Sequence, residues 1–219
     1  MAIEADYRKG GCMRDATSIQ TLADCLHYMQ VGDVDRAIAL FPEEVREHFP
    51  KELRKIHLFH IEKNGLSINQ IVALANTLTG EHLSATTIQN WTKREVRKII
   101  GVPRVGKKYS LQQAAIIYLL DDLKHLFSLE ETSSLLALIF NNPDRDEDDL
   151  ISPIDFYRLY AEYAKSTSPI DLLDTRAKRS IEKMGHTHPN IVHVLKLCLY
   201  AHRVTTLELE AKHYLNRFI

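Results

Sequence analysis

The sequence has few of the residues that interrupt helices or cross-link chains. Its 219 residues include only 8 glycines, 7 prolines and 3 cysteines. So few turn-forming residues argue against an all-β protein, and helix-forming residues dominate the remainder. With 45% hydrophobic residues, a chain of this length buries a substantial core. We therefore expect a folded, mostly helical protein of one or two domains.

Paired cysteines and long apolar runs are also missing. Cys12, Cys25 and Cys198 lie far apart in the sequence and form no Cys-x-x-Cys pair. An odd number of scattered thiols, with no apolar run of secretory length near Met1, is typical of a reducing compartment. Even the longest apolar stretches, such as Ala114–Leu120, are too short to cross a bilayer. We expect a cytoplasmic protein that does not enter a membrane.

The charge is nearly balanced overall but unevenly distributed. The net charge of the chain is −1, whereas the segment 81–108 contains seven basic residues and two acidic ones. A local excess of positive charge is what contact with nucleic acid requires. A solvated helix face has the same composition, so charge alone leaves both interpretations open. The basic residues of this segment are Lys93, Arg94, Arg97, Lys98, Arg104, Lys107 and Lys108.

Several helix starts can be read from capping signals. Ser67, Ser110 and Ser128 each precede a Gln or Glu by three residues, which is the pattern of a capping box. Ser152 and Ser168 are each followed by proline, a residue favoured at the first helical position. Further helices are expected at 18–29, after Pro42 and Pro50, and from Pro189 to about Phe218, the last of them bent at 204–206.

An acidic stretch divides the chain. The segment 141–151 reads as a linker because it is rich in Asn and Asp. It separates an N-terminal helical extension (1–65) and a central region (66–140) from a C-terminal helical region (152–219). The C-terminal region contains Ile191–Ala201, which is apolar on several sides and predicts burial against more than one neighbour. We expect this breadth to support a homodimer.

The central region predicts a pair of helices joined by a turn. The apolar residues of 67–78 recur at helical spacing, and Ser84 is placed to cap a second helix. In that second helix Ile88, Trp91, Val96 and Ile99 are expected to face the core. Amides can pair with adenine, and Arg or Lys with guanine, so the polar residues of this helix are candidate DNA contacts. They are Thr86, Thr87, Gln89, Asn90, Lys93, Arg94 and Arg97.

A loop rich in cations follows at 101–110. Two glycines bracket it, and Arg104, Lys107 and Lys108 are candidate contacts to DNA phosphates. Tyr109 is expected to pack its ring inward and to present its hydroxyl to a phosphate. The loop is therefore predicted to form a short β wing beside the helix pair.

The combined pattern resembles the MerR family of transcription regulators. The stretches that carry the resemblance are Thr87-Ile-Gln-Asn-Trp91, Lys108-Tyr-Ser110 and Phe127-Ser-Leu-Glu-Glu131. The chain resembles still more closely a family of small proteins of Gram-positive bacteria known mainly as a domain of unknown function. The resemblance implies that Gln89 and Asn90 contact bases and that Lys108 and Tyr109 contact phosphates. The turn before the second helix is about two residues longer than in MerR proteins, and nothing after Ala161 resembles their coiled coil.

Sites of other kinds have weaker support. Asp144, Asp146 and Asp148 have calcium-loop spacing, but Asp149 stands where such a loop needs glycine. No phosphate-binding or hydrolase motif occurs in the sequence, so we expect no catalytic residues and no cofactor. Several histidines and one cysteine cluster late in the chain, and Cys198 lies four residues before His202 on one helix face, a spacing that can bind a transition metal. No second paired ligand set appears elsewhere in the sequence, so ordinary core or surface histidines are the favoured interpretation. The clustered residues are His186, His188, His193, Cys198 and His202.

These patterns predict a helical bundle that contains a MerR-like winged helix-turn-helix. We expect the protein to bind double-stranded DNA as a homodimer on a roughly palindromic operator and to repress transcription, in response to an unknown small-molecule effector if any. A helical adaptor that binds a protein partner without contacting DNA is the main alternative, and a metal-responsive sensor is another.

Overall fold

The computed structural model describes residues 14–43, 46, 65–79, 83–93, 96–143, 145 and 147–218. Within these ranges the chain forms helices joined by loops, with isolated β-bridges and no strand. The expectation of a mostly helical bundle is confirmed. Cys12 and the helix predicted to start at Pro50 lie outside the described residues.

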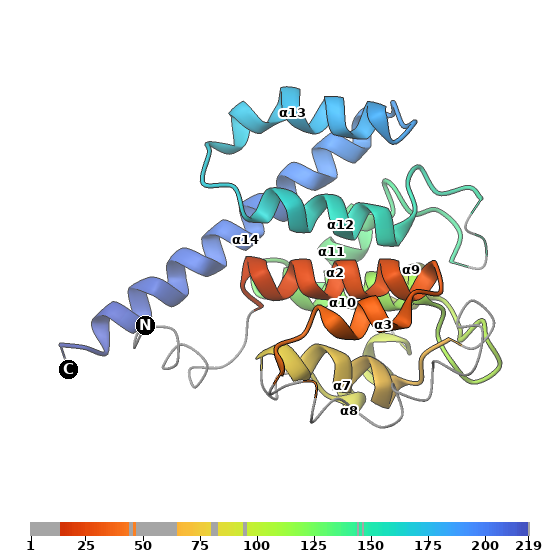
Figure 1. Ribbon diagram of the computed structural model, residues 1–219. Coiled ribbons are helices and arrows are strands. Elements are labelled where there is room, and N and C mark those ends of the chain that lie inside the picture. The colour runs from red at the N-terminus through yellow and green to blue at the C-terminus, as the bar shows by residue number, and fades with distance from the viewer. Residues whose placement is uncertain are drawn as a thin grey trace.

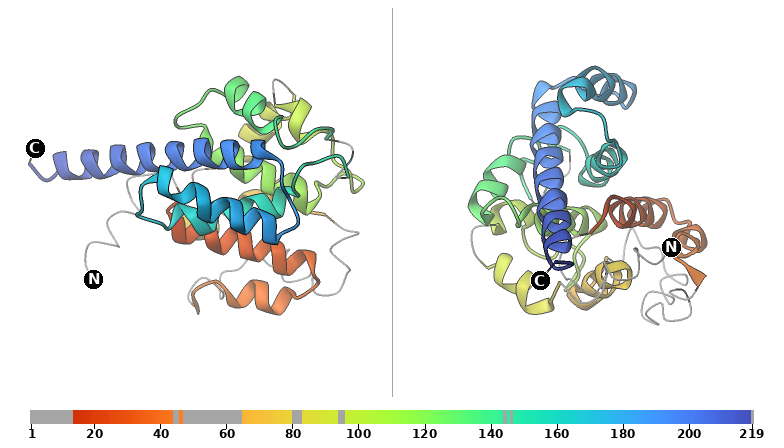
Figure 2. Two further views of the ribbon diagram at one scale, coloured as in Figure 1. Left: turned by 90° about the horizontal axis from the view of Figure 1, so that it is seen from above. Right: turned by 90° about the vertical axis from the view of Figure 1, so that its left-hand side faces the viewer.

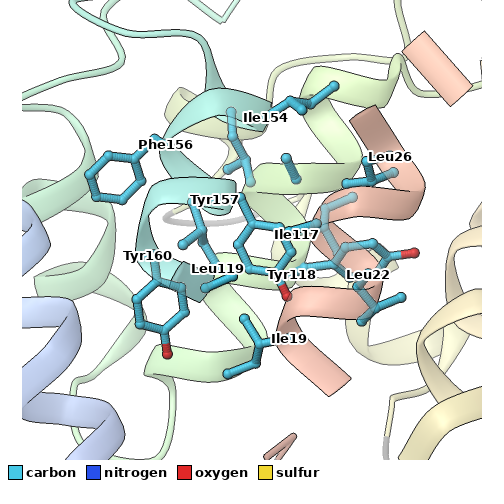
Figure 3. Packing of buried hydrophobic residues seen from close by; sticks show 14 of the residues in the cluster. Ile19, Leu22, Leu26, Ile117, Tyr118, Leu119, Ile154, Phe156, Tyr157 and Tyr160 are labelled. Carbon is cyan, nitrogen blue, oxygen red and sulfur yellow. The ribbon is translucent and has the colours of Figure 1, made fainter. Parts of the chain in front are cut away.

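The centre of the molecule is built from three helices. α2 (Ala16–Gln30) and α10 (Leu111–Leu123) pack against each other, and α12 (Pro153–Ala164) packs against both (Figure 1). Every residue of α10 except Gln112 is buried, because neighbours cover this helix on all sides. Figure 3 shows side chains of α2, α10 and α12, among them Leu22, Tyr118 and Tyr157, in one cluster.

The remaining helices lie on either side of this centre. On one side, α7 (Ile68–Thr79) contacts α2, and α8 (Ala85–Trp91) contacts α7. On the other side, α13 (Ile170–Lys183) and the long α14 (Pro189–Leu215) form a hairpin beyond α12 (Figures 1 and 2). The shorter helices are α3 (Val34–Ala39), which packs on α2, and α9 (Arg97–Ile100) and α11 (Leu129–Leu136), which pack near α10.

One hydrophobic core runs through the described chain. Its buried residues extend from Ile19 to Ala201 and come from the N-terminal, central and C-terminal regions alike. The acidic segment folds back on the end of the central region, since the backbone N–H of Leu150 donates to the carbonyl of Ile139 at 2.9 Å. The core is therefore continuous across the boundaries expected from the sequence.

A buried ion pair network ties the N-terminal end of α2 to α10. Arg14 is fully buried, and its guanidinium donates to Asp122 Oδ1 at 2.9 Å and to the carbonyl of Tyr118 at 2.9 Å. A second guanidinium nitrogen lies 3.0 Å from Asp121 Oδ2. Burial alone would lower the pKa of Arg14, but Asp122 and its other neighbours raise it above its ordinary value. A charge that is both buried and paired fixes the position of this segment.

Most capping signals are confirmed. Ser110 and Ser128 form complete capping boxes, and Ser152 caps α12 with Pro153 at the first helical position. The expected cap at Ser168 is wrong, because α13 begins one residue later, after Pro169, without a side-chain cap. The short helix α3, which the side chain of Asp33 caps, was not expected from the sequence.

α14 differs from its prediction in two respects. The expected bend at 204–206 is wrong, since the helix is continuous from Pro189 to Leu215. In addition, most apolar side chains of Ile191–Ala201, which were expected to support a homodimer, pack inside the chain itself. Seven residues of this stretch are buried against the chain's own helices, namely Ile191, Val192, Val194, Leu195, Cys198, Leu199 and Ala201.

Candidate nucleic-acid interface

The start of α7 is fixed by contacts to its own first turn and to the core. The backbone N–H of Ser67 donates to Gln70 Oε1 at 2.8 Å, and that of Gln70 donates to Ser67 Oγ at 3.3 Å, which completes the predicted capping box. Further along the helix, the hydroxyl of Tyr118 donates to the carbonyl of Ile71 at 3.0 Å. α7 is thereby attached to α10, the most buried helix of the fold.

A side chain of α7 binds the backbone just before α8. Asn76 donates its amide N–H to the carbonyl of Leu83 at 2.8 Å and accepts the N–H of Leu83 at 3.1 Å. Ser84 then caps α8 by accepting the backbone N–H of Thr87 at 3.1 Å, as the sequence predicts. The start of α8 is therefore fixed relative to α7 although the turn between them is long.

α8 has one apolar and one polar side. Ile88 is fully buried and Trp91 is 6% exposed, as expected. Lys124 lies over the ring of Trp91, with its Nζ 5.8 Å from the ring centroid. The opposite face is formed by Thr86, Gln89 and Asn90, all exposed, and exposed Lys93 follows in the turn after the helix.

The exposed polar groups of this region are not used within the described fold. The side-chain amides of Gln89 and Asn90 make no hydrogen bond to a described residue. Likewise, Lys93, Arg97 and Lys107 form no ion pair with any residue in the described ranges. These exposed donors and acceptors are therefore available to a partner molecule.

The second helix is shorter than the sequence suggested. It ends at Trp91, with Thr92 as its C-cap, and the chain enters a separate helix, α9, at Arg97. Arg97 is exposed, but it does not share a helix with Gln89 and Asn90 as expected. Arg94 lies outside the described residues. The buried positions Val96 and Ile99 were predicted correctly.

The cationic loop forms a miniature hairpin. The backbones of Val105 and Lys108 exchange both hydrogen bonds at 3.0 Å, so Gly106 and Lys107 make the two-residue tip. Gly106 has a φ of 64°, which favours glycine. Lys107 is exposed at the tip and Lys108 is half-buried beside it.

A second backbone pair attaches this hairpin to the start of α7. The N–H of Tyr109 donates to the carbonyl of Leu66 at 2.8 Å, and the N–H of Leu66 donates to that of Tyr109 at 2.7 Å. Gly65, at φ 53°, lies so close that an added Cβ would be 2.5 Å from the Tyr109 carbonyl oxygen. Tyr109 is 4% exposed, in keeping with the expected inward packing of its ring.

The base of the hairpin is held by two polar side chains. Gln113 is fully buried and donates to the carbonyls of Ile100 and Val102, at 2.6 and 2.7 Å. Arg104 is half-buried, and its Nε donates to the carbonyl of Pro143 at 2.6 Å. Arg104, which the sequence suggested as a phosphate contact, is thus engaged inside the protein.

Two residues that hold this arrangement were not identified from the sequence. Asn76 lies near the end of a predicted helix and before a turn, where a side-chain amide typically binds backbone groups. Gln113 was expected only as half of a capping box, and its long-range partners at Ile100 and Val102 carry no sequence signal. These two residues position the candidate interface without belonging to it.

The late histidines do not come together. Cys198 and His202 are buried on α14, whereas His188 and His193 are exposed. Among the described residues, no group of three or more His, Cys, Asp or Glu side chains is arranged to hold a metal ion. Asp144 and Asp146 of the calcium-like spacing lie outside the described residues. No helix in the described part of the chain is long and apolar enough to cross a membrane.

Comparison with known proteins places similarity in this part of the chain. The model of the family DUF1836, described as a domain of unknown function, matches residues 51–161. An uncharacterized protein of Bacillus subtilis (strain 168), YkrK, is 44% identical over 93 residues, which is 42% of this chain and 40% of that protein. The match thus covers less than half of that relative's length. No solved structure matches the chain.

Proposed function

The chain belongs to the DUF1836 family, and we propose that the matched region, which includes α7, α8 and the Val105–Lys108 hairpin, binds double-stranded DNA. In this proposal α7 and α8 act as a MerR-like helix-turn-helix, and the hairpin acts as its wing. The protein would regulate transcription by occupying an operator.

One observation carries the proposal. The exposed face of α8 presents the side-chain amides of Gln89 and Asn90, and Lys93 follows just after the helix; none of the three is used by a described residue of the protein. Asn and Gln can form paired hydrogen bonds with adenine in the major groove, and Lys can reach guanine. Small residues at the start of α8, such as Thr86, allow the helix to approach the duplex closely.

The hairpin is proposed to contact the phosphates and not the bases. Lys107 at its exposed tip and Lys108 beside it carry positive charge that can contact phosphates. Such contacts supply salt-dependent affinity and little sequence preference. Arg104 is assigned a different task, since its engagement with the Pro143 carbonyl holds the base of the hairpin.

The first test is binding to DNA upstream of the protein's own coding sequence. Fluorescence anisotropy at physiological salt with excess competitor DNA should show saturable binding. The double variant Gln89→Ala and Asn90→Ala should lose most of the preference over competitor, with about tenfold or greater weakening on the specific site. Glu130→Ala on α11, equally exposed, is the matched control and should bind like the wild type.

The result also separates DNA binding from the adaptor alternative. An adaptor that uses the same basic face for an acidic protein would bind all DNA sequences equally weakly. Equal affinity of the wild type for upstream and competitor DNA would contradict the proposal.

A further inference from the structure

The C-terminal part of α14 extends beyond the body of the protein (Figures 1 and 2). Residues 191–205 of this helix include its buried positions, the last of which is Thr205. After Thr205, no described residue of α14 is buried. At 1.5 Å per residue, the segment from Thr205 to Leu215 projects about 15 Å. The side chains of this projecting segment after Thr205 are exposed or half-buried.

The projecting segment carries an exposed apolar stripe. Leu207 is 64% exposed and Phe218 is 70% exposed, and they belong to a contiguous row of exposed apolar side chains, which is the feature that marks interaction surfaces. The stripe starts on the packed half of the helix, at Leu197. Its members are separated alternately by three and four residues: Leu197, Tyr200, Val204, Leu207, Ala211, Tyr214 and Phe218.

Alternation of three and four residues has a specific structural meaning. It keeps apolar side chains in line along a helix that is wound around another helix, with an average repeat of 3.5 residues. Within α14 the pattern holds from Leu197 to Tyr214, and Phe218 follows at the next expected position, just beyond the end of the helix at Leu215. A stripe of this kind fits a second stripe of the same spacing better than it fits a flat surface.

We propose that this stripe on α14 pairs with the same stripe of a second copy of the chain. Its large exposed side chains expose on the order of 700 Å² per chain, which is the upper limit of what pairing can bury and approaches the roughly 800 Å² that one partner contributes to a standard interface. A self-complementary patch is what a two-fold symmetric dimer uses. The sequence-based expectation of a dimer rested on Ile191–Ala201, most of which is buried inside the chain. The pairing surface proposed here lies instead on the exposed side of α14 and extends towards its C-terminal end.

The charges beside the stripe favour a protein partner over a lipid surface. The projecting segment and the residues up to Phe218 contain two acidic residues, Glu208 and Glu210, and two basic residues, Lys212 and Arg217. Glu208 and Lys212 form an ion pair on the same helix. A helix that binds anionic membranes carries an excess of Lys and Arg on its polar face, which is not the case here. A balanced segment can instead face an identical one without net repulsion.

The test is the mass of the full-length protein in solution over a concentration series, by sedimentation equilibrium. The wild type should sediment at twice the monomer mass. Leu207→Lys should raise the dissociation constant about 100-fold or more, because the substitution appears twice in the interface. Leu172→Lys on α13 is the matched control, since Leu172 is 69% exposed and lies outside the stripe.

The outcomes decide the proposal without any DNA present, so it stands or fails independently of the DNA-binding role. A second stripe variant, Tyr214→Lys, should also be monomeric while it keeps the helical circular dichroism spectrum of the wild type. A wild-type protein that is monomeric at all concentrations would overturn the proposal. Equal weakening by Leu207→Lys and Leu172→Lys would overturn it too, as would a monomer that pellets with anionic phospholipid vesicles.

Discussion

Asn76 binds both backbone groups of Leu83, with hydrogen bonds of 2.8 and 3.1 Å, and so fixes the entry of the chain into α8. Asn76→Ala removes both bonds and leaves two backbone groups of Leu83 without this partner. We expect a loss of about 2 kcal/mol in the free energy of unfolding, measured by urea denaturation. Asn69→Ala is the control, because Asn69 is an exposed residue of the same helix. A similar loss in both variants would contradict the role of Asn76.

Gly65 and Gly106 provide a matched pair of glycines at positive φ. An added Cβ at Gly65 meets the carbonyl oxygen of Tyr109 at 2.5 Å, whereas at Gly106 nothing lies within 4 Å. Gly106→Ala should therefore cost about 1 kcal/mol of stability, from backbone strain alone. Gly65→Ala should cost clearly more and separate the hairpin from α7. Thermal unfolding of the two variants measures the difference, and equal values would show that the close contact is unimportant.

Lys107 is predicted to contact phosphate and not bases. Lys107→Ala should weaken binding to all DNA sequences by a similar factor and reduce the slope of log K against log[salt] by about 1. Anisotropy titrations at several salt concentrations give this slope. Lys178→Ala on α13, which removes an equally exposed lysine, should leave the slope unchanged. A change in sequence preference without a change in slope would contradict this assignment.

His202 is predicted to make stability depend on pH. Burial lowers its pKa to about 4, against a smaller opposing effect of Asp15. The unfolded chain takes up the proton near pH 6.5 and the folded chain near pH 4. The contribution of His202 is thus fully present above pH 6.5 and is lost as the pH falls towards 4, by at most about 3 kcal/mol.

The variant His202→Phe isolates this effect. Phe can keep the edge-on packing of His202 against Tyr160, whose ring centroid is 6.1 Å away, but it does not titrate. The wild type should therefore lose stability relative to the variant between pH 6.5 and 4, in chemical denaturation at each pH. Parallel curves for the two proteins over this range would show that His202 does not titrate differently on folding.

The sequence predicted those parts of the fold that depend on neighbouring residues. The capping boxes at Ser110 and Ser128 depend on residues three apart, and both are present. The polar face at Gln89 and Asn90 and the buried face at Ile88 follow from helical spacing in the same way.

What the sequence did not predict depends on contacts between distant residues. Arg104 was expected to face phosphate because it is a cation in a loop, yet the carbonyl of Pro143, 39 positions away, is its partner. The burial of Ile191–Ala201 was predicted correctly, but the sequence did not identify the helices that cover this stretch, which are α10, α12 and α13. By contrast, the alternating spacing from Leu197 to Phe218 was readable in the sequence, but the apolar residues on the buried side of the same helix obscured it.

The central claim, that the outer face of α8 enters a DNA groove, is tested most directly by photo-crosslinking. The residue p-benzoylphenylalanine is introduced in place of Thr86, which lies on that face, and in place of Glu130 on α11 as the control. A crosslink to bound upstream DNA is expected from position 86 and none from position 130. Binding of the DNA with no crosslink from position 86, or with crosslinks of equal yield from both positions, would contradict it.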